Sequence, residues 1–139
     1  MVKARTPKIN RAVVAPHYSL EHYCRNLNGW PRTWMGLEKD LQPGEQILAL
    51  IRPFLESLAQ SSLTPKTIQQ HVDNMWALGG EFIRDLHNDP PLRKQPVERV
   101  LRQMVEYGGP LLYHGGEDEQ RSFDSTCGKF RRFIGEAAR

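Results

Sequence analysis

The sequence contains only two cysteines, Cys24 and Cys127, and they lie far apart in the chain. So few thiols exclude a disulfide-rich scaffold, and their spacing excludes the paired cysteines of a structural zinc site. Long apolar runs are also missing, since no segment approaches the roughly 20 apolar residues that cross a bilayer. We therefore expect a cytoplasmic protein with no membrane segment and with reduced thiols, although the sequence also allows one disulfide between the two cysteines.

Motifs for catalysis and cofactor binding are missing as well. None of the three glycine pairs belongs to a phosphate-binding loop, and no serine lies in the setting of a nucleophile elbow. The densest group of histidine and cysteine, His17, His22 and Cys24, lacks the spacing of metal ligands. The sequence therefore predicts a protein that is not an enzyme and that holds no metal or cofactor.

The alternation of apolar and polar residues that marks half-buried strands is nearly absent, whereas helical periodicity is strong. Apolar residues recur every three or four positions in five segments that are separated by proline and glycine. The expected helices cover residues 19–29, 45–60, 64–87, 96–107 and 118–137. This pattern predicts an all-α fold, a compact single-domain bundle of about five helices over residues 17–139, with a basic N-terminal tail over residues 1–16.

Proline and glycine predict several interruptions. Pro31 disfavours helix at the preceding residue, so we expect a loop over residues 30–34, whose two tryptophans either stack on unpaired bases or, as is more common, cover the core. Residues 40–44 should form another break, and Pro53 should kink or split its helix. The pair Gly79-Gly80 indicates either a neighbouring helix packed closely there or a helix broken into two halves.

The helix expected between Thr64 and His87 is the longest. Thr64 has the character of an N-cap, and Pro65 suits the first helical position because its missing N–H has no partner there. A stripe of apolar residues follows at helical spacing: Ile68, Val72, Met75, Trp76, Phe82, Ile83 and Leu86.

The positive charge of the chain is concentrated in the tail. The whole sequence carries a formal charge of +3, residues 1–16 carry +4 with no acidic residue, and residues 17–139 carry −1. The basic residues of the tail are Lys3, Arg5, Lys8 and Arg11. A flexible basic arm suits a phosphate backbone, and the alternative is a solvated tail that increases solubility.

Two further basic clusters lie within the helical part of the sequence. The first surrounds the start of the fourth expected helix and contains Arg93, Lys94, Arg99 and Arg102. The second is on the last helix, where the spacing directs Phe130 and Phe133 inward and Lys129, Arg131 and Arg132 outward. If the clusters meet on one surface they form a phosphate-binding patch, and if they do not, each is an ordinary solvated face.

One segment carries a resemblance to a known family. Leu63-Thr64-Pro65-Lys66-Thr67-Ile68 is followed at helical spacing by His71, Met75, Leu78 and Phe82. This run, within residues 63–87, resembles the opening of the core-binding domain of tyrosine recombinases and phage integrases. The resemblance implies a small helical domain that clamps DNA through its backbone. Gly79-Gly80 departs from the family, and no catalytic domain follows, so it implies a stand-alone relative of the DNA-clamping half.

These observations favour a non-enzymatic, DNA-associated accessory protein that binds the phosphate backbone of double-stranded DNA. The alternative is a protein–protein interaction module, antitoxin-like or inhibitor-like, that uses the apolar loop over residues 108–116. In that loop Leu111, Leu112 and Tyr113 lie between glycine-rich turns. They either tuck under the bundle and cover the core or stay exposed as a partner-binding surface.

Overall fold

The computed structural model describes residues 17–112 and 115–137. No strand occurs within these ranges, so the predicted all-α fold is confirmed; the predicted basic tail, residues 1–16, lies outside them. None of the helices in the described part has both the length and the apolar character that a membrane-crossing helix needs. The elements are α2 (Leu20–Tyr23), η1 (Leu27–Gly29), α3 (Trp30–Trp34), η2 (Glu38–Asp40), α4 (Leu41–Ala59), α5 (Pro65–Asn88), η3 (Pro90–Lys94), α6 (Val97–Met104) and α7 (Glu117–Ala137).

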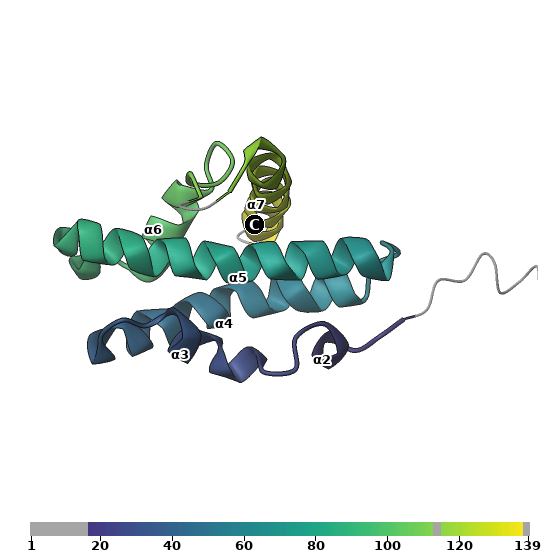
Figure 1. Ribbon diagram of the computed structural model, residues 1–139, viewed down its shortest axis with the longest axis horizontal. Helices are drawn as coiled ribbons and strands as arrows, with labels where there is room; N and C mark the ends of the chain where they lie inside the picture. Colours follow the sequence, from purple (N-terminus) through teal and green to yellow (C-terminus); the bar gives the residue numbers. More distant parts are fainter. Residues whose placement is uncertain (1–16, 113–114, 138–139) are drawn as a thin grey trace, which may run out of the picture.

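The pair α4 and α5 forms the centre of the bundle (Figure 1). The short turn over residues 60–64 makes the two helices antiparallel neighbours. The short helices α2 and α3 lie on one side of this pair, and α6 and α7 lie on the other. The core is built from the inward faces of α4, α5, α6 and α7, with Ile47, Ile51, Leu55, Met75, Leu78, Phe82, Leu101, Phe123 and Phe130 among its fully buried members.

Helix α5 begins as its sequence predicts. The Thr64 hydroxyl oxygen accepts a hydrogen bond from the backbone N–H of Thr67 at 3.2 Å, and Pro65 occupies the first turn. The expected apolar stripe is buried except at Trp76, which is 44% exposed. Trp76 therefore shares the helical spacing of the stripe but does not join the core. Its indole Nε1 instead donates to Thr33 Oγ1 at 2.9 Å, outside the core.

The two glycines of α5 do not break the helix, which is continuous through them. A Cβ atom at Gly79 would lie only 2.1 Å from Cζ2 of Trp34, so the absence of a side chain makes room for the indole ring. The same indole donates from Nε1 to the Trp76 carbonyl oxygen at 2.9 Å. Of the two expectations for this position, the close approach of a neighbouring helix is confirmed, and that neighbour is α3.

The region before α4 departs from expectation. The predicted helix over residues 19–29 is divided, because α2 ends at Tyr23 and a turn follows. The predicted loop over residues 30–34 is instead the helix α3. Pro31 lies in its first turn, where a backbone N–H would have no intrahelical acceptor, so the missing N–H of proline costs no hydrogen bond. Trp30 and Trp34 are each 8% exposed, so both tryptophans cover the core and neither ring is free to stack on a base.

The predicted break over residues 40–44 is also wrong. Helix α4 begins at Leu41, and Pro43 falls in its first turn, where a backbone N–H has no intrahelical acceptor. The helix continues through Pro53 to Ala59, so it is not split there.

A polar seam joins α5 to α7 within the otherwise apolar interface. His71 Nδ1 lies 2.7 Å from Thr126 Oγ1, and Asn74 Nδ2 donates to Thr126 Oγ1 at 2.8 Å and to Ser122 Oγ at 3.1 Å. Burial, together with the nearby Lys129 charge, lowers the pKa of His71 and so favours the neutral ring. Because these bonds are directional, the seam fixes how α7 is rotated on α5.

Candidate nucleic-acid interface

The polar face of α6 is the first wall of the candidate site. Val100, Leu101 and Val105 are buried and turn the opposite side of the helix to solvent. That outward stripe follows the helical repeat and contains Arg99, Arg102 and Gln103, and Glu106 extends the wall on the turn after α6. Packing of α6 against α4 therefore decides that both arginines of this helix face away from the core.

The last turns of α7 form the second wall. Phe130 is fully buried, whereas the neighbouring Arg131 and Arg132 are exposed. Because α6 and α7 both pack on α4, a groove of about 990 Å³ lies between them. Its lining contains four arginines, Arg99, Arg102, Arg131 and Arg132, and three glutamates, Glu98, Glu106 and Glu136. The two predicted basic clusters thus meet through these four arginines.

The charges of the groove are partly paired within it. Arg102 donates from Nη2 to Glu98 Oε2 at 2.9 Å, in an exposed pair one helical turn apart. The structure gives the other three arginines no ion-pair partner among the described residues, and they outnumber Glu106 and Glu136. Guanidinium groups bind phosphate through two parallel hydrogen bonds, so free arginines in a groove suit a phosphodiester chain. The acidic residues make this a site of modest positive charge.

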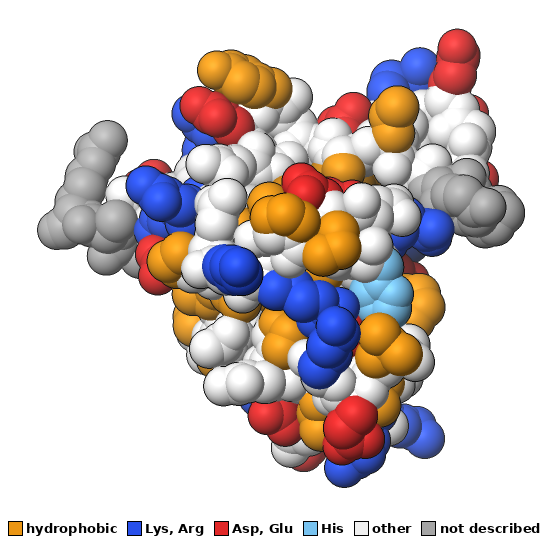
Figure 2. All heavy atoms as spheres, turned by 90° about the vertical axis from the view of Figure 1, so that its left-hand side faces the viewer, with side chains coloured by type: hydrophobic (Ala, Val, Ile, Leu, Met, Phe, Trp, Pro, Cys, Tyr) orange, Lys and Arg blue, Asp and Glu red, His pale blue; other side chains and the backbone are white. Residues whose placement is uncertain are grey.

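The remaining predicted basic residues lie elsewhere. Lys94 is exposed and lines a separate depression with Lys39, and Lys129 is half-buried on the α7 side that approaches His71. Arg93 is held in an ion pair and is not free for a ligand. On the end of the bundle drawn in Figure 2, described Lys and Arg side chains lie among acidic and hydrophobic ones instead of forming a continuous basic field. The predicted contacts of Lys3, Arg5, Lys8 and Arg11 lie outside the described residues.

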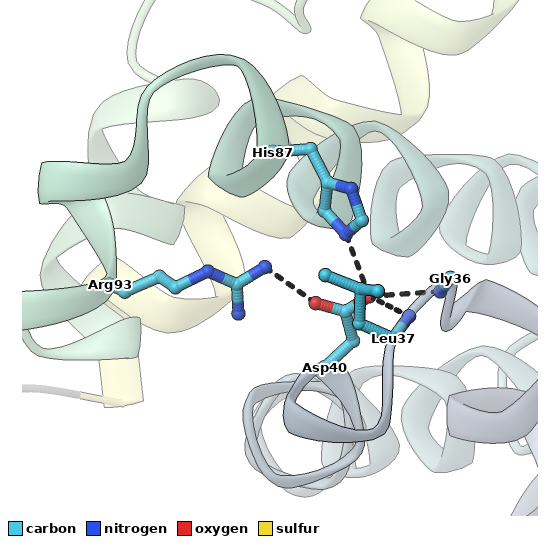
Figure 3. Close-up of polar contacts among 5 residues, drawn as sticks. All are labelled: Gly36, Leu37, Asp40, His87 and Arg93. Atoms are coloured by element: carbon cyan, nitrogen blue, oxygen red, sulfur yellow. Dashed lines mark hydrogen bonds and ion pairs between the residues drawn. The ribbon is translucent and has the colours of Figure 1, made fainter.

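Arg93 is bound by the fully buried carboxylate of Asp40 (Figure 3). Asp40 Oδ1 accepts from Arg93 Nη2 at 2.6 Å, and Oδ2 lies 2.7 Å from His87 Nε2. Oδ2 also accepts from the backbone N–H groups of Gly36 and Leu37, each at 2.8 Å. Burial by itself would raise the pKa of Asp40, but these hydrogen bonds outweigh it and hold the pKa well below its usual range. With both oxygens occupied, the cluster joins the start of α4 to the end of α5 and to η3.

The residues of the apolar loop after α6 differ in burial, so one of them covers the core and another stays exposed. Leu112 is half-buried and packs against the core, whereas Leu111 is 84% exposed. Tyr113 lies outside the described residues. The backbone N–H of Leu112 donates to Gln120 Oε1 at 2.9 Å, which holds this side of the loop to α7. The core role therefore fits Leu112 and the exposed role fits Leu111.

Tyr107 was missed by the sequence interpretation. It follows Glu106 directly and is 94% exposed, the largest exposed fraction among the large apolar side chains of the described residues. Gly108, next in the chain, has a φ of +113°, which turns the backbone away after the aromatic residue. The available signal was a tyrosine placed directly after the apolar stripe of α6 ended.

Both cysteines are free thiols, so the disulfide that the sequence allowed is not present. Burial raises the pKa of Cys24 to about 11 and that of Cys127 to about 12, which keeps both protonated at neutral pH. Within residues 17–112 and 115–137, no group of three or more His, Cys, Asp or Glu side chains is arranged to hold a metal ion.

Comparisons with models of known protein families, with curated proteins and with solved structures found no match. The resemblance of residues 63–87 to the core-binding domain of tyrosine recombinases and phage integrases therefore stays a prediction.

Proposed function

We propose that the protein is a non-enzymatic, DNA-associated accessory protein that binds the phosphate backbone in the groove between α6 and α7. The observation that carries the proposal is the meeting of Arg99, Arg102, Arg131 and Arg132, from two distant parts of the chain, along one groove. Phosphate contacts of this kind position a protein on nucleic acid without reading sequence. The basic residues of the tail add a second attraction of the same sign.

The test compares two double variants by fluorescence anisotropy with labelled DNA at low and moderate salt. Arg131→Gln with Arg132→Gln should weaken binding and flatten its salt dependence, because the slope falls by about one unit for each phosphate that is no longer neutralised. The matched control, Arg25→Gln with Lys66→Gln, removes two exposed positive charges outside the groove. It should weaken binding much less.

A third variant tests the same site with the opposite sign. Glu106→Gln removes a negative charge from the groove lining and should tighten DNA binding at low salt. Failure of the protein to bind DNA at low salt would overturn the proposal. If the groove variant and its control weaken DNA binding equally, the net charge of the protein and not this groove determines the affinity.

A protein-interaction module remains the second candidate because of Leu111. A leucine that is 84% exposed beside a half-buried Leu112 suits an interface with a protein partner or a second copy. Leu111→Ser should then abolish self-association in sedimentation velocity or binding to a purified partner, while the melting temperature stays unchanged. A chain that is monomeric with and without the substitution, and whose partner binding is unaffected, would contradict this candidate.

A further inference from the structure

We infer that the groove between α6 and α7 takes a single nucleic-acid strand and that one of its bases stacks on the ring of Tyr107. This inference rests on the proposed function and specifies the form of nucleic acid that the groove receives. The position of Tyr107 is the first observation that supports it. The residue comes four positions after Gln103 and directly after Glu106, both of which line the groove. Tyr107 is not itself a lining residue; it lies on the turn after α6, directly after Glu106 in the groove wall.

The exposure of the ring is the second observation. Tyr107 is 94% exposed, and it takes part in none of the ring–ring contacts among the described aromatic residues. An aromatic ring left in water normally lies against neighbouring side chains, because its faces are apolar. Proteins bind single strands with cations that follow the backbone and with exposed aromatic faces that receive bases. Tyr107 supplies an open ring next in the chain to a groove that is lined with guanidinium groups.

The shape and charge of the site favour a single strand over a duplex. In a duplex each base is already stacked on both sides, so only a terminal or extruded base could reach the Tyr107 ring. The arginines also line a hollow instead of a convex ridge, and Arg99 and Arg131 approach it from two different helices. A single strand is narrow enough to enter such a hollow and contact both walls, whereas a duplex would touch only its rim. The glutamates of the groove weaken electrostatic attraction to either form, so contacts to bases matter more, and bases are open to such contacts in a single strand.

The experiment measures the affinity of the full chain for labelled oligothymidine and for a hairpin duplex, at one salt concentration. The wild type should bind oligothymidine more tightly than the hairpin. Tyr107→Ala should weaken oligothymidine binding about fivefold or more and leave hairpin binding unchanged. Tyr107→Phe should retain the wild-type affinity because it keeps the ring. Leu111→Ala is the matched control, since it shortens another exposed apolar side chain near Tyr107 in sequence without removing an aromatic face.

The outcomes separate this inference from the function on which it rests. If the Arg131 and Arg132 variant loses affinity for both probes but Tyr107→Ala loses affinity for neither, the stacking inference is overturned and the proposed function stands. Equal weakening by Tyr107→Ala and Leu111→Ala, or a change of oligomeric state with Tyr107→Ala, would assign the ring to a protein interface and overturn the inference. If neither probe binds at low salt, the proposed function fails and this inference fails with it. Because Tyr107 is almost fully exposed, its substitution leaves the fold intact, which circular dichroism checks.

Discussion

Alanine substitutions at the adjacent glycines Gly79 and Gly80 of α5 should change the stability of the protein in opposite directions. In a helix interior alanine is more favourable than glycine by about 1 kcal/mol. At Gly80 an added Cβ would lie 3.8 Å from Cδ1 of Trp34, an ordinary contact, so the helix gains from the change. At Gly79 the added Cβ would lie 2.1 Å from Cζ2 of the same ring. One substitution is therefore accommodated and the other is blocked.

The magnitude at Gly79 follows from what the indole must do. Trp34 is 8% exposed and its ring is rigid, so the whole ring must shift by roughly 1 Å or more to restore an ordinary contact. Overpacking of this kind costs about 1–3 kcal/mol, and loss of the bond from Trp34 Nε1 to the Trp76 carbonyl adds about 1 kcal/mol. After the helix-propensity gain, Gly79→Ala should lower the free energy of unfolding by about 1–3 kcal/mol. Gly80→Ala should raise it by about 0.5–1 kcal/mol.

Urea unfolding followed by circular dichroism measures both changes. A third measurement places Gly79→Ala in a Trp34→Ala background, where the obstacle is absent and the alanine should no longer destabilise. If Gly79→Ala and Gly80→Ala shift stability in the same direction and by the same amount, the indole does not occupy the space beside Gly79 and the reasoning is refuted.

Three further predictions concern the buried carboxylate, the loop and the thiols. Asp40→Asn should lower the free energy of unfolding by about 3 kcal/mol, because it discharges a buried ion pair. The pKa of Asp40 is held below its unfolded value of about 3.9, so this contribution to stability is present above pH 4 and is lost as the pH falls further. Urea unfolding at several pH values measures it, and an equal difference in unfolding free energy between wild type and variant at every pH would contradict the prediction. Leu112→Ser should cost about 2 kcal/mol and Leu111→Ser less than about 0.5 kcal/mol, and equal melting temperatures for the two variants would count against their different burial. Burial raises the pKa of Cys24 and Cys127, so both should react slowly with iodoacetamide in the native protein and rapidly in urea. Mass spectrometry follows the labelling, and rapid labelling of the native protein would contradict the raised pKa values.

The sequence was sufficient where structure is decided locally. Thr64 and Pro65 predicted the first turn of α5 because an N-cap and a proline at the first position act within a few residues. The periodic apolar stripes likewise predicted the buried faces of α6 and α7, including Val100, Leu101 and Phe130. Each of these signals lies inside the element that it specifies.

The sequence was insufficient where distant contacts decide. Pro31 was interpreted as a loop signal, but burial of Trp30 and Trp34 against the bundle makes the first turn of a helix the better conformation there. Arg93 was predicted to bind phosphate, yet its partner Asp40 lies 53 residues earlier and no local pattern connects the two. Trp76 followed the helical stripe and is still 44% exposed, with its indole N–H donating to Thr33 Oγ1, a residue 43 positions earlier that no local pattern connects to it.

The sequence predicted the candidate site only on the condition that its two basic clusters lie on one surface. The two basic clusters were expected to form a patch if they met, and whether they meet depends on where α4 holds α6 and α7. Four of the seven residues meet in the groove, whereas Arg93, Lys94 and Lys129 are placed elsewhere. Tyr107 was not recognised, because the periodicity ends there and only the surrounding structure shows that its ring is uncovered.

The polar seam also determines where Arg131 points in the groove. Thr126 is bonded to His71, and Arg131 lies five residues, or about 7.5 Å of helix, further along α7. A slip of one residue at the seam would turn Arg131 by about 100° around the helix axis and remove it from the groove. The rotation of α7 is thus set by the seam near the middle of the helix, at Ser122 and Thr126, and decides where Arg131 points closer to its end. A substitution at His71, which lies outside the groove, should therefore weaken the proposed DNA binding by misdirecting Arg131.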